Sequence, residues 1–325
     1  MDGMMDGRET VRASLYFQTP SRFARDLPGE HGSDFYNCGM NPSPDDRQTN
    51  GTDEWGCVWA TLADTHLGEV QSYPLKTWDD LPRLSIPDFL SDHRWEGMQA
   101  ARAKANGRYM LGNICSLYER LHFLRGLENL WCDILEEPER VSALLDILVE
   151  SNIKVVRRYA RYGVDGIMFT DDWGLQDRLM IRPALWREIW KPAYRRVFDA
   201  AHSEGIDCWM HSCGYIVDIL DDLIEIGLNA VHMDQQENMG LDNLCARFRG
   251  RINFFACVDI QKTMVTGSPD EIRAYARKMA ACLGTKEGGF IPRWYTDPVG
   301  AGHKQESIDI MCEEFLKIDR EIYGG

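Results

Sequence analysis

Two side chains of metal-binding type stand two positions apart in the stretch CWMHSCGYIVD, residues 208–218: His211 and Cys213. On an extended chain, residues two apart point to the same face, so both could reach one ion lying about 2.0–2.3 Å from each donor atom. The same pattern also fits a packed histidine beside a small buried cysteine. The pair closes an apolar run, and this place at a predicted strand end favours the metal site.

A zinc site needs three or four ligands, so further donors must come from neighbouring strands. Asp234 ends the run NAVHMD, and Cys257 ends INFFAC. Both are predicted as metal ligands together with His211 and Cys213. The alternatives are a loop or capping acid for Asp234 and a small core residue for Cys257. His232 alternates with Asp234 on the same run and is a weaker candidate.

Two adjacent acids, Asp171 and Asp172, follow the apolar run IMFT. Neighbouring residues of a strand point to opposite faces, so we expect one of them in the site and the other capping a helix or meeting solvent. Either could act as a general acid or accept a hydrogen bond from a substrate. Other predicted substrate-binding residues near strand ends are Asn113, Trp173 and Gln176.

The segment RWYTDPVGAGH, residues 293–303, adds three further candidates at the last predicted strand. Arg293 and His303 could hold an anionic or aromatic ligand, and Tyr295 could take part in catalysis. The alternative interpretation is a mobile surface loop.

Strand-like and helix-like segments alternate over more than two hundred residues, which calls for parallel strands joined by helices. We predict strands within 108–114, 164–172, 206–213, 229–234, 251–259 and 288–294, and helices within 128–163 (two), 182–205, 215–227, 241–250, 268–284 and 306–324. Ser268 is a plausible N-cap. The length fits an α/β fold of the (β/α)₈ TIM-barrel type, in which working residues lie at the C-terminal ends of the strands.

Residues 1–105 are rich in glycine, proline and aspartate and are predicted to form an irregular cap and the entry to the barrel, with the main β/α repeats in 106–325. The whole chain of 325 residues is expected to be one domain.

The net charge of −15 argues against nucleic acid as a partner, because a polyanion repels such a surface. No apolar segment reaches signal-peptide or membrane-spanning length, so we expect a cytoplasmic protein without a membrane partner. The ten cysteines are spread along the chain and are expected to be reduced thiols.

Several sequence blocks resemble the uroporphyrinogen decarboxylase superfamily over nearly the whole chain. They are WGCVWA, LKTWDDLPRL, ERLHFLRGLENLWCDILEEPERVSALLDIL, FTDDWG, MHSCG, CVDIQKTMVTGSPDEIRAYARKM and GGFIP. The resemblance implies a (β/α)₈ barrel, in agreement with the alternation of segments.

The resemblance is closer to one branch of the superfamily than to the other. True decarboxylases carry an N-terminal motif of the form R-x-x-G-R-Y that grips carboxylates, whereas this N-terminal region reads SRFARDLPGEHG. Corrinoid-dependent methyltransferases of the methylcobalamin:coenzyme M type bind zinc through H-x-C at a strand end and a later cysteine. His211 and Cys213 match the H-x-C.

The late cysteine of that branch is missing, because the corresponding segment reads GGFIPRWYTDP. Cys257 could substitute for it, and Asp234 resembles in placement the acidic ligand of the related cobalamin-independent methionine synthase. The resemblance implies a zinc-dependent enzyme that moves a methyl group between a separate corrinoid protein and a small donor or acceptor, such as a thiol, a folate, or a methoxy or methylamine compound. The alternatives are a decarboxylase of the uroporphyrinogen type and a non-catalytic barrel that binds a corrinoid or tetrapyrrole.

Overall fold

The computed structural model describes residues 5–44, 46, 51–61 and 68–324. Seven parallel strands form one sheet in the order β1-β5-β6-β7-β8-β9-β10. Their bounds are Phe35–Cys38 (β1), Tyr109–Asn113 (β5), Gly166–Thr170 (β6), Asp207–His211 (β7), Ala230–Met233 (β8), Asn253–Ala256 (β9) and Phe290–Pro292 (β10). The six strands predicted from the sequence all lie in this sheet, and β1 is an addition from the segment expected to be irregular.

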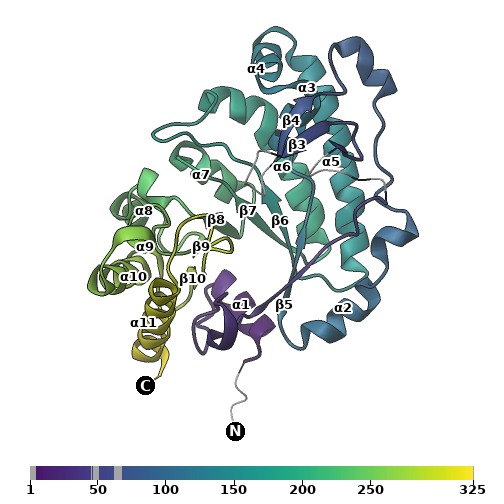
Figure 1. The fold of residues 1–325 in the computed structure, drawn as a ribbon. Helices are drawn as coiled ribbons and strands as arrows, with labels where there is room; N and C mark the ends of the chain where they lie inside the picture. Colours follow the sequence, from purple (N-terminus) through teal and green to yellow (C-terminus); the bar gives the residue numbers. More distant parts are fainter. Residues whose placement is uncertain (1–4, 45, 47–50, 62–67, 325) are drawn as a thin grey trace.

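Helices connect the strands and surround the sheet (Figure 1). They are α2 (Met98–Ala105) before β5, then α3 (Tyr118–Arg125), α4 (Leu127–Glu136) and α5 (Pro138–Ala160) before β6, α6 (Pro183–Ser203), α7 (Val217–Glu225), α8 (Leu241–Phe248), the short α9 (Thr263–Thr266), α10 (Pro269–Leu283) and α11 (Gln305–Tyr323). Ser268 caps α10 in a reciprocal pair with Glu271, as the sequence indicated.

A short segment around Asp26 bridges the two edge strands of the sheet, pairing in parallel with Arg293 and antiparallel with Ser33. The backbone N–H of Asp26 donates to the carbonyl of Pro292, the N–H of Trp294 donates to the carbonyl of Asp26, and the N–H of Asp34 donates to the carbonyl of Arg25. These bonds connect β10 to the start of β1. The predicted α/β class of the TIM-barrel type is therefore confirmed, with seven regular parallel strands in the described part of the chain and a bridging segment at Asp26 in place of a regular eighth strand.

Aromatic side chains fill the interior of the barrel. Phe35, Tyr109, Trp209 and Phe255 come from four strands and pack with ring centroids 5.2–5.8 Å apart, mostly edge to face. Helix α1 (Gly7–Leu15) adds Val11 and Leu15 to the same cluster. The lower barrel is thus a solid core, and an open site can exist only above it, at the C-terminal ends of the strands.

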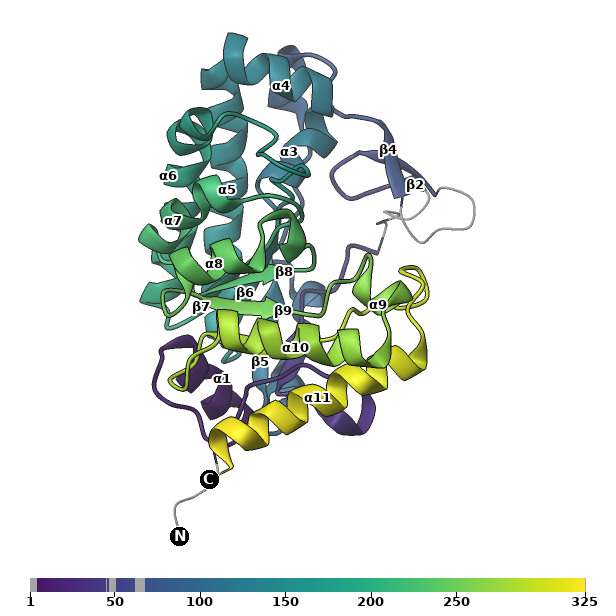
Figure 2. The ribbon, with the colours of Figure 1, turned by 90° about the vertical axis from the view of Figure 1, so that its left-hand side faces the viewer.

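The first hundred residues also form a small antiparallel sheet of β2 (Gly51–Thr52), β3 (Val58–Thr61) and β4 (Gly68–Ser72). Figure 2 shows this sheet standing apart from the barrel strands, beyond α3. Buried Trp55 and Trp59 pack it against the rest of the protein. Asp53 accepts a hydrogen bond from Arg120 of α3 at 2.9 Å. Parts of the predicted cap, residues 1–4, 45, 47–50 and 62–67, lie outside the described residues.

The register of the parallel strands decides which polar side chains lie next to one another. Thr170 pairs with His211, His211 with His232, and His232 with Phe255 across four neighbouring strands. Thr170, His211 and His232, widely separated in the sequence, therefore lie side by side on neighbouring strands, next to Phe255 of the aromatic core. None of the helices in the described part of the chain is both long and apolar enough to cross a membrane.

Candidate functional site

A cavity of about 600 Å³ opens at the C-terminal ends of the strands. Its floor is the top of the aromatic core, and several polar side chains from the strand ends are part of its lining. The floor is formed by Phe35, Leu111, Met168 and Phe255, and the polar lining includes Asp26, Asn37, Asn113, Thr170, His211, His232, Arg293 and Thr296. A second cavity, of about 400 Å³, shares Asn113 and Thr170 with the first and extends under the small sheet to Glu119, Arg120 and Asp172.

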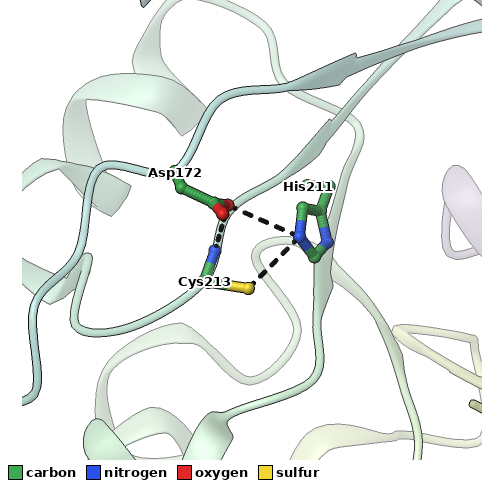
Figure 3. A group of neighbouring side chains, drawn as sticks. All are labelled: Asp172, His211 and Cys213. Atoms are coloured by element: carbon green, nitrogen blue, oxygen red, sulfur yellow. Dashed lines mark hydrogen bonds and ion pairs between the residues drawn. The ribbon is translucent and has the colours of Figure 1, made fainter. Parts of the chain in front are cut away.

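His211, Cys213 and Asp172 meet between the two cavities. The Nε2 atom of His211 lies 3.4 Å from the Sγ atom of Cys213 and 3.5 Å from Oδ1 of Asp172. Figure 3 shows that both contacts end on the same ring nitrogen. The backbone N–H of Cys213 donates to Oδ1 of Asp172 at 2.8 Å. These three donors lie within 4.8 Å of one another and could hold a metal ion.

Two glycines bring the loops that carry these residues together. Gly174 follows Asp172, Gly214 follows Cys213, and the N–H of Gly174 donates to the carbonyl of Cys213 at 3.2 Å. A Cβ atom on Gly214 would lie 2.3 Å from the carbonyl oxygen of Gly174, and the φ of Gly214 is +73°. Only glycine fits this close approach and this backbone conformation. The glycines of FTDDWG and MHSCG are therefore part of what positions the site.

Asp171 points away from the site and is fully buried beneath α3. Its carboxylate accepts the backbone N–H groups of Leu117, Tyr118 and Glu119 at 2.8–3.0 Å and the hydroxyl of Tyr194 at 2.7 Å. These are the free N–H groups at the start of a helix, so Asp171 is a cap supplied from a distant loop. The predicted catalytic role does not suit this position.

The other ligands suggested by the sequence, Asp234 and Cys257, lie deeper than His211 and Cys213. Oδ1 of Asp234 forms an ion pair with Arg293 and lies 3.5 Å from Nε2 of His232 and 3.4 Å from the Sγ atom of Cys257. Cys257 is fully buried, whereas Cys213 is only partly buried. Asp234 also belongs to a possible metal group with His211 and His232, but the guanidinium already occupies that carboxylate.

The remaining predicted residues divide into lining and non-lining groups. Asn113 and Arg293 line the large cavity. Trp173 is fully buried against Tyr118, and Gln176 is exposed on the loop after β6, so neither borders the cavities. Tyr295 is half-buried beside His303, with ring centroids 5.7 Å apart, and the ring of His303 contacts the carbonyl of Ile260. Trp173, Gln176, Tyr295 and His303 are thus not among the residues that line the two cavities, although burial and, with it, the charges of Asp234 and Cys213 raise the pKa of Tyr295.

Several residues that line the pocket are not marked by any pattern in the sequence. Asn37 and Cys38 come from β1, Gly39 follows that strand directly, and Asp26 comes from the segment that bridges β10 and β1, all within the part expected to be irregular. These strands are too short to carry a clear alternation of apolar and polar residues. Glu119 and Arg120 lie in the helical stretch that begins after β5, and no local pattern marks them as facing a cavity.

Negative charge dominates the meeting point of the two cavities. Burial and the neighbouring carboxylates of Asp172 and Asp234 raise the pKa of Cys213 to about 12. Burial and the charges of Asp171 and Asp172 raise the pKa of Glu119 to about 8. A cation placed among these groups would relieve both effects, because it favours the ionised forms.

His122, on the face of α3 near the second cavity, provides a pH prediction. Burial and the charge of Arg120 lower the pKa of His122 to about 4. Unfolded histidine binds a proton near pH 6.5, so below that pH the unfolded state gains protons first and stability falls until about pH 4. Above pH 6.5 both states are neutral and the effect vanishes.

The free energy of unfolding should therefore fall between pH 7 and pH 4.5 in both proteins. We expect the fall to be about 2 kcal/mol smaller in His122→Gln than in the unchanged protein, because glutamine binds no proton. Urea unfolding at the two pH values measures the difference. Equal losses in both proteins would contradict the buried, neutral state of this histidine.

The architecture defines a class: a parallel (β/α) barrel with a pocket at the C-terminal strand ends, beside which side chains of metal-ligand type gather. Comparison with family models gives a match to "Uroporphyrinogen decarboxylase (URO-D)" over residues 63–292. The chain belongs to this family. A search of curated protein sequences gave no significant match.

Among solved structures, a methyltransferase from Methanosarcina mazei is similar over 97% of this chain and 99% of that chain, with a TM-score of 0.73 and 14% sequence identity. A mannanase from Bacillus subtilis has a TM-score of 0.48, with 13% identity over 94% of this chain and 92% of its own. The first likeness supports the same fold along the full length of both chains.

Proposed function

We propose that this protein is a methyltransferase that uses a zinc ion held by Asp172, His211 and Cys213, with the methyl group carried by a separate corrinoid protein. The observation that carries the proposal is the meeting of three donors around one point, with 3.4 and 3.5 Å between the imidazole nitrogen and the other two donor atoms. Tetrahedral zinc with bonds of 2.0–2.3 Å requires donor separations of roughly 3.3–3.7 Å.

Asp172 takes the place of the late cysteine that related methyltransferases use. Oδ1 of Asp172 lies 3.5 Å from Nε2 of His211, a separation at which one cation can contact both atoms. A donor set of one oxygen, one nitrogen and one sulfur suits zinc and leaves a fourth position for a substrate. Asp234 is not available in the same way because Arg293 neutralises it.

When bound, zinc would supply a Lewis acid that lowers the pKa of a substrate thiol or polarises a methoxy oxygen. The chain's own residues would do the rest. The aromatic floor of Phe35 and Phe255 excludes water from below the site, since it is continuous with the barrel core. Asn113 and Thr170 border both cavities and can orient a polar group of the substrate by hydrogen bonding.

A decarboxylase that grips several carboxylates receives less support from the pocket. In the described part of the chain, the arginines that line the two cavities are Arg293 and Arg120. Each is paired with a buried acid, Asp234 and Asp53 respectively. The acid partner of each arginine reduces its attraction for a substrate carboxylate. The site therefore supports methyl transfer better than decarboxylation.

The test begins with metal content and methyl transfer. The purified protein is expected to bind one zinc per chain and to demethylate methylcobalamin in the presence of a simple thiol or tetrahydrofolate, followed by the change in cobalamin absorbance. A protein that neither contains zinc nor binds added zinc would refute the proposal.

The role of Asp172 has its own test. Asp172→Ala is expected to weaken zinc affinity by at least about 100-fold, because it removes one of three ligands. Competition with a chelating dye measures the affinity. Asp177→Ala is the matched control, because Asp177 lies on the same loop, is exposed and, within the described part of the chain, forms its ion pair with Arg178. Equal affinity in the two variants would remove Asp172 from the site.

A further inference from the structure

The large cavity contains a carboxylate that the proposed zinc site does not use. Asp26 lines this cavity together with His211, and it comes from the segment that bridges β10 and β1. Its Oδ1 atom accepts a hydrogen bond from the hydroxyl of Ser33 at 2.7 Å, and the residue is half-buried. An acidic side chain therefore borders the space in which a substrate would lie.

The positive charges around Asp26 are bound to other acids. Three arginines lie near it in the chain or line the same cavity, and each pairs with a different carboxylate. No ion pair in the described part of the chain involves Asp26 itself. The cavity thus presents one carboxylate without a cationic partner and no guanidinium without an acidic one. The three pairs are Arg22–Asp34, Arg25–Asp319 and Arg293–Asp234.

The floor of the cavity suits the apolar part of an organic cation. Phe35, Leu111, Met168 and Phe255 form it. The guanidinium of Arg293 already lies 5.2 Å from the centroid of the Phe255 ring, so this floor accepts a cation beside an aromatic side chain. The volume of about 600 Å³ is in the range of cavities that bind small organic molecules.

We infer that the large cavity selects a substrate that carries an ammonium group, and that Asp26 determines this specificity. The inference rests on the proposed function, because it names the class of small molecule that shares the cavity with the proposed zinc ligand His211. A thiol with an amino group would bind with its ammonium at Asp26. A thiol with a sulfonate or carboxylate in the same place would be repelled.

The first test measures binding to metal-free protein with ligands that share one aromatic ring. Benzylamine, benzyl alcohol and benzoate are cationic, neutral and anionic at neutral pH. Titration calorimetry is expected to show benzylamine binding about 10-fold more tightly than benzyl alcohol, and benzoate binding most weakly, because Asp26 attracts only the ammonium. Equal affinities, or tightest binding of benzoate, would overturn the inference. This measurement needs neither zinc nor methyl transfer, so its outcome is separate from that of the proposed function.

Substitutions of Asp26 identify the residue responsible. Asp26→Asn removes the charge and keeps an oxygen that can accept the hydrogen bond of Ser33. Its affinity for benzylamine is expected to fall about 10-fold and its affinity for benzyl alcohol to stay the same. Asp26→Glu is expected to retain the preference for benzylamine. If Asp26→Asn binds benzylamine as tightly as the unchanged protein, Asp26 does not determine the specificity.

Asp242→Asn is the matched control, because Asp242 is an exposed acid on α8 that pairs with Lys278. It is expected to leave both affinities unchanged. An equal loss of benzylamine affinity in Asp242→Asn would mean that the overall negative charge of the protein, and not Asp26, attracts the amine. Thermal unfolding of each variant verifies that a loss of affinity is not a loss of fold.

The second test compares thiols as methyl acceptors from methylcobalamin. Cysteamine, 2-mercaptoethanol and 2-mercaptoethanesulfonate share one carbon chain and are cationic, neutral and anionic. KM is expected to be lowest for cysteamine and highest for the sulfonate. Asp26→Asn is expected to raise the KM for cysteamine about 10-fold and to leave the KM for 2-mercaptoethanol unchanged. Methyl transfer with one KM for all three thiols would overturn the inference and leave the proposed function standing.

Discussion

His211→Ala and Cys213→Ala are each expected to abolish stoichiometric zinc binding and to lower methyl transfer by about a thousandfold or more. Each substitution removes one of three donors, and two remaining donors hold zinc too weakly to survive purification. The measurement is zinc per chain by atomic spectroscopy, together with the rate of methylcobalamin demethylation.

The neighbouring structure makes these two substitutions interpretable. The imidazole of His211 borders the large cavity, and its side chain is 13% exposed, so its removal leaves the aromatic core in place. Cys132→Ala is the matched control, because Cys132 is an exposed free thiol on α4. Full zinc content in either site variant, with an unchanged melting temperature, would show that the ion lies elsewhere.

Asp171→Ala is expected to lower the free energy of unfolding by about 4 kcal/mol, although it lies next to a proposed zinc ligand. The substitution leaves three backbone N–H groups at the start of α3 and the hydroxyl of Tyr194 without their acceptor. Each unsatisfied buried group costs roughly 1–3 kcal/mol, offset in part by water entering the space. Urea unfolding monitored by tryptophan fluorescence measures the loss.

Asp172→Ala provides the contrast within the same pair of acids. Its side chain is 38% exposed and accepts one backbone hydrogen bond, from Cys213. Its removal is expected to cost about 1 kcal/mol in metal-free protein. If Asp172→Ala lowered the free energy of unfolding more than Asp171→Ala, the structural role would belong to Asp172 and not to Asp171.

These two aspartates also mark the limit of what the sequence can predict. Because adjacent residues of a strand point to opposite faces, the sequence indicated that Asp171 and Asp172 have different roles. It could not assign the purposes, because the partners of Asp171 lie at the start of α3, more than fifty residues earlier in the chain. The donor for Asp172 is Cys213, 41 residues later.

The first hundred residues were the least predictable part of the fold. A strand of four residues, β1, and a closure made by a few backbone bonds at Asp26 are too short to show a hydrophobic period. They form because neighbouring backbone supplies their hydrogen bonds: β5 pairs with β1, and the segment at Asp26 bonds to β10 and to the start of β1. The alternation of long helices and apolar strands after residue 106 was predictable, since each element carries its own period and caps.

The sequence alone determined the barrel class, the order of its strands and helices after residue 106, and the presence of H-x-C at a strand end. Those features depend on periods and caps contained within a dozen or so neighbouring residues. Only the tertiary structure decided that Asp172 meets His211 and Cys213, that Asp171 caps α3, and that His232 touches the far nitrogen of His211. These contacts depend on the register of parallel strands and on the close approach of two glycine loops, and no local stretch of sequence contains either.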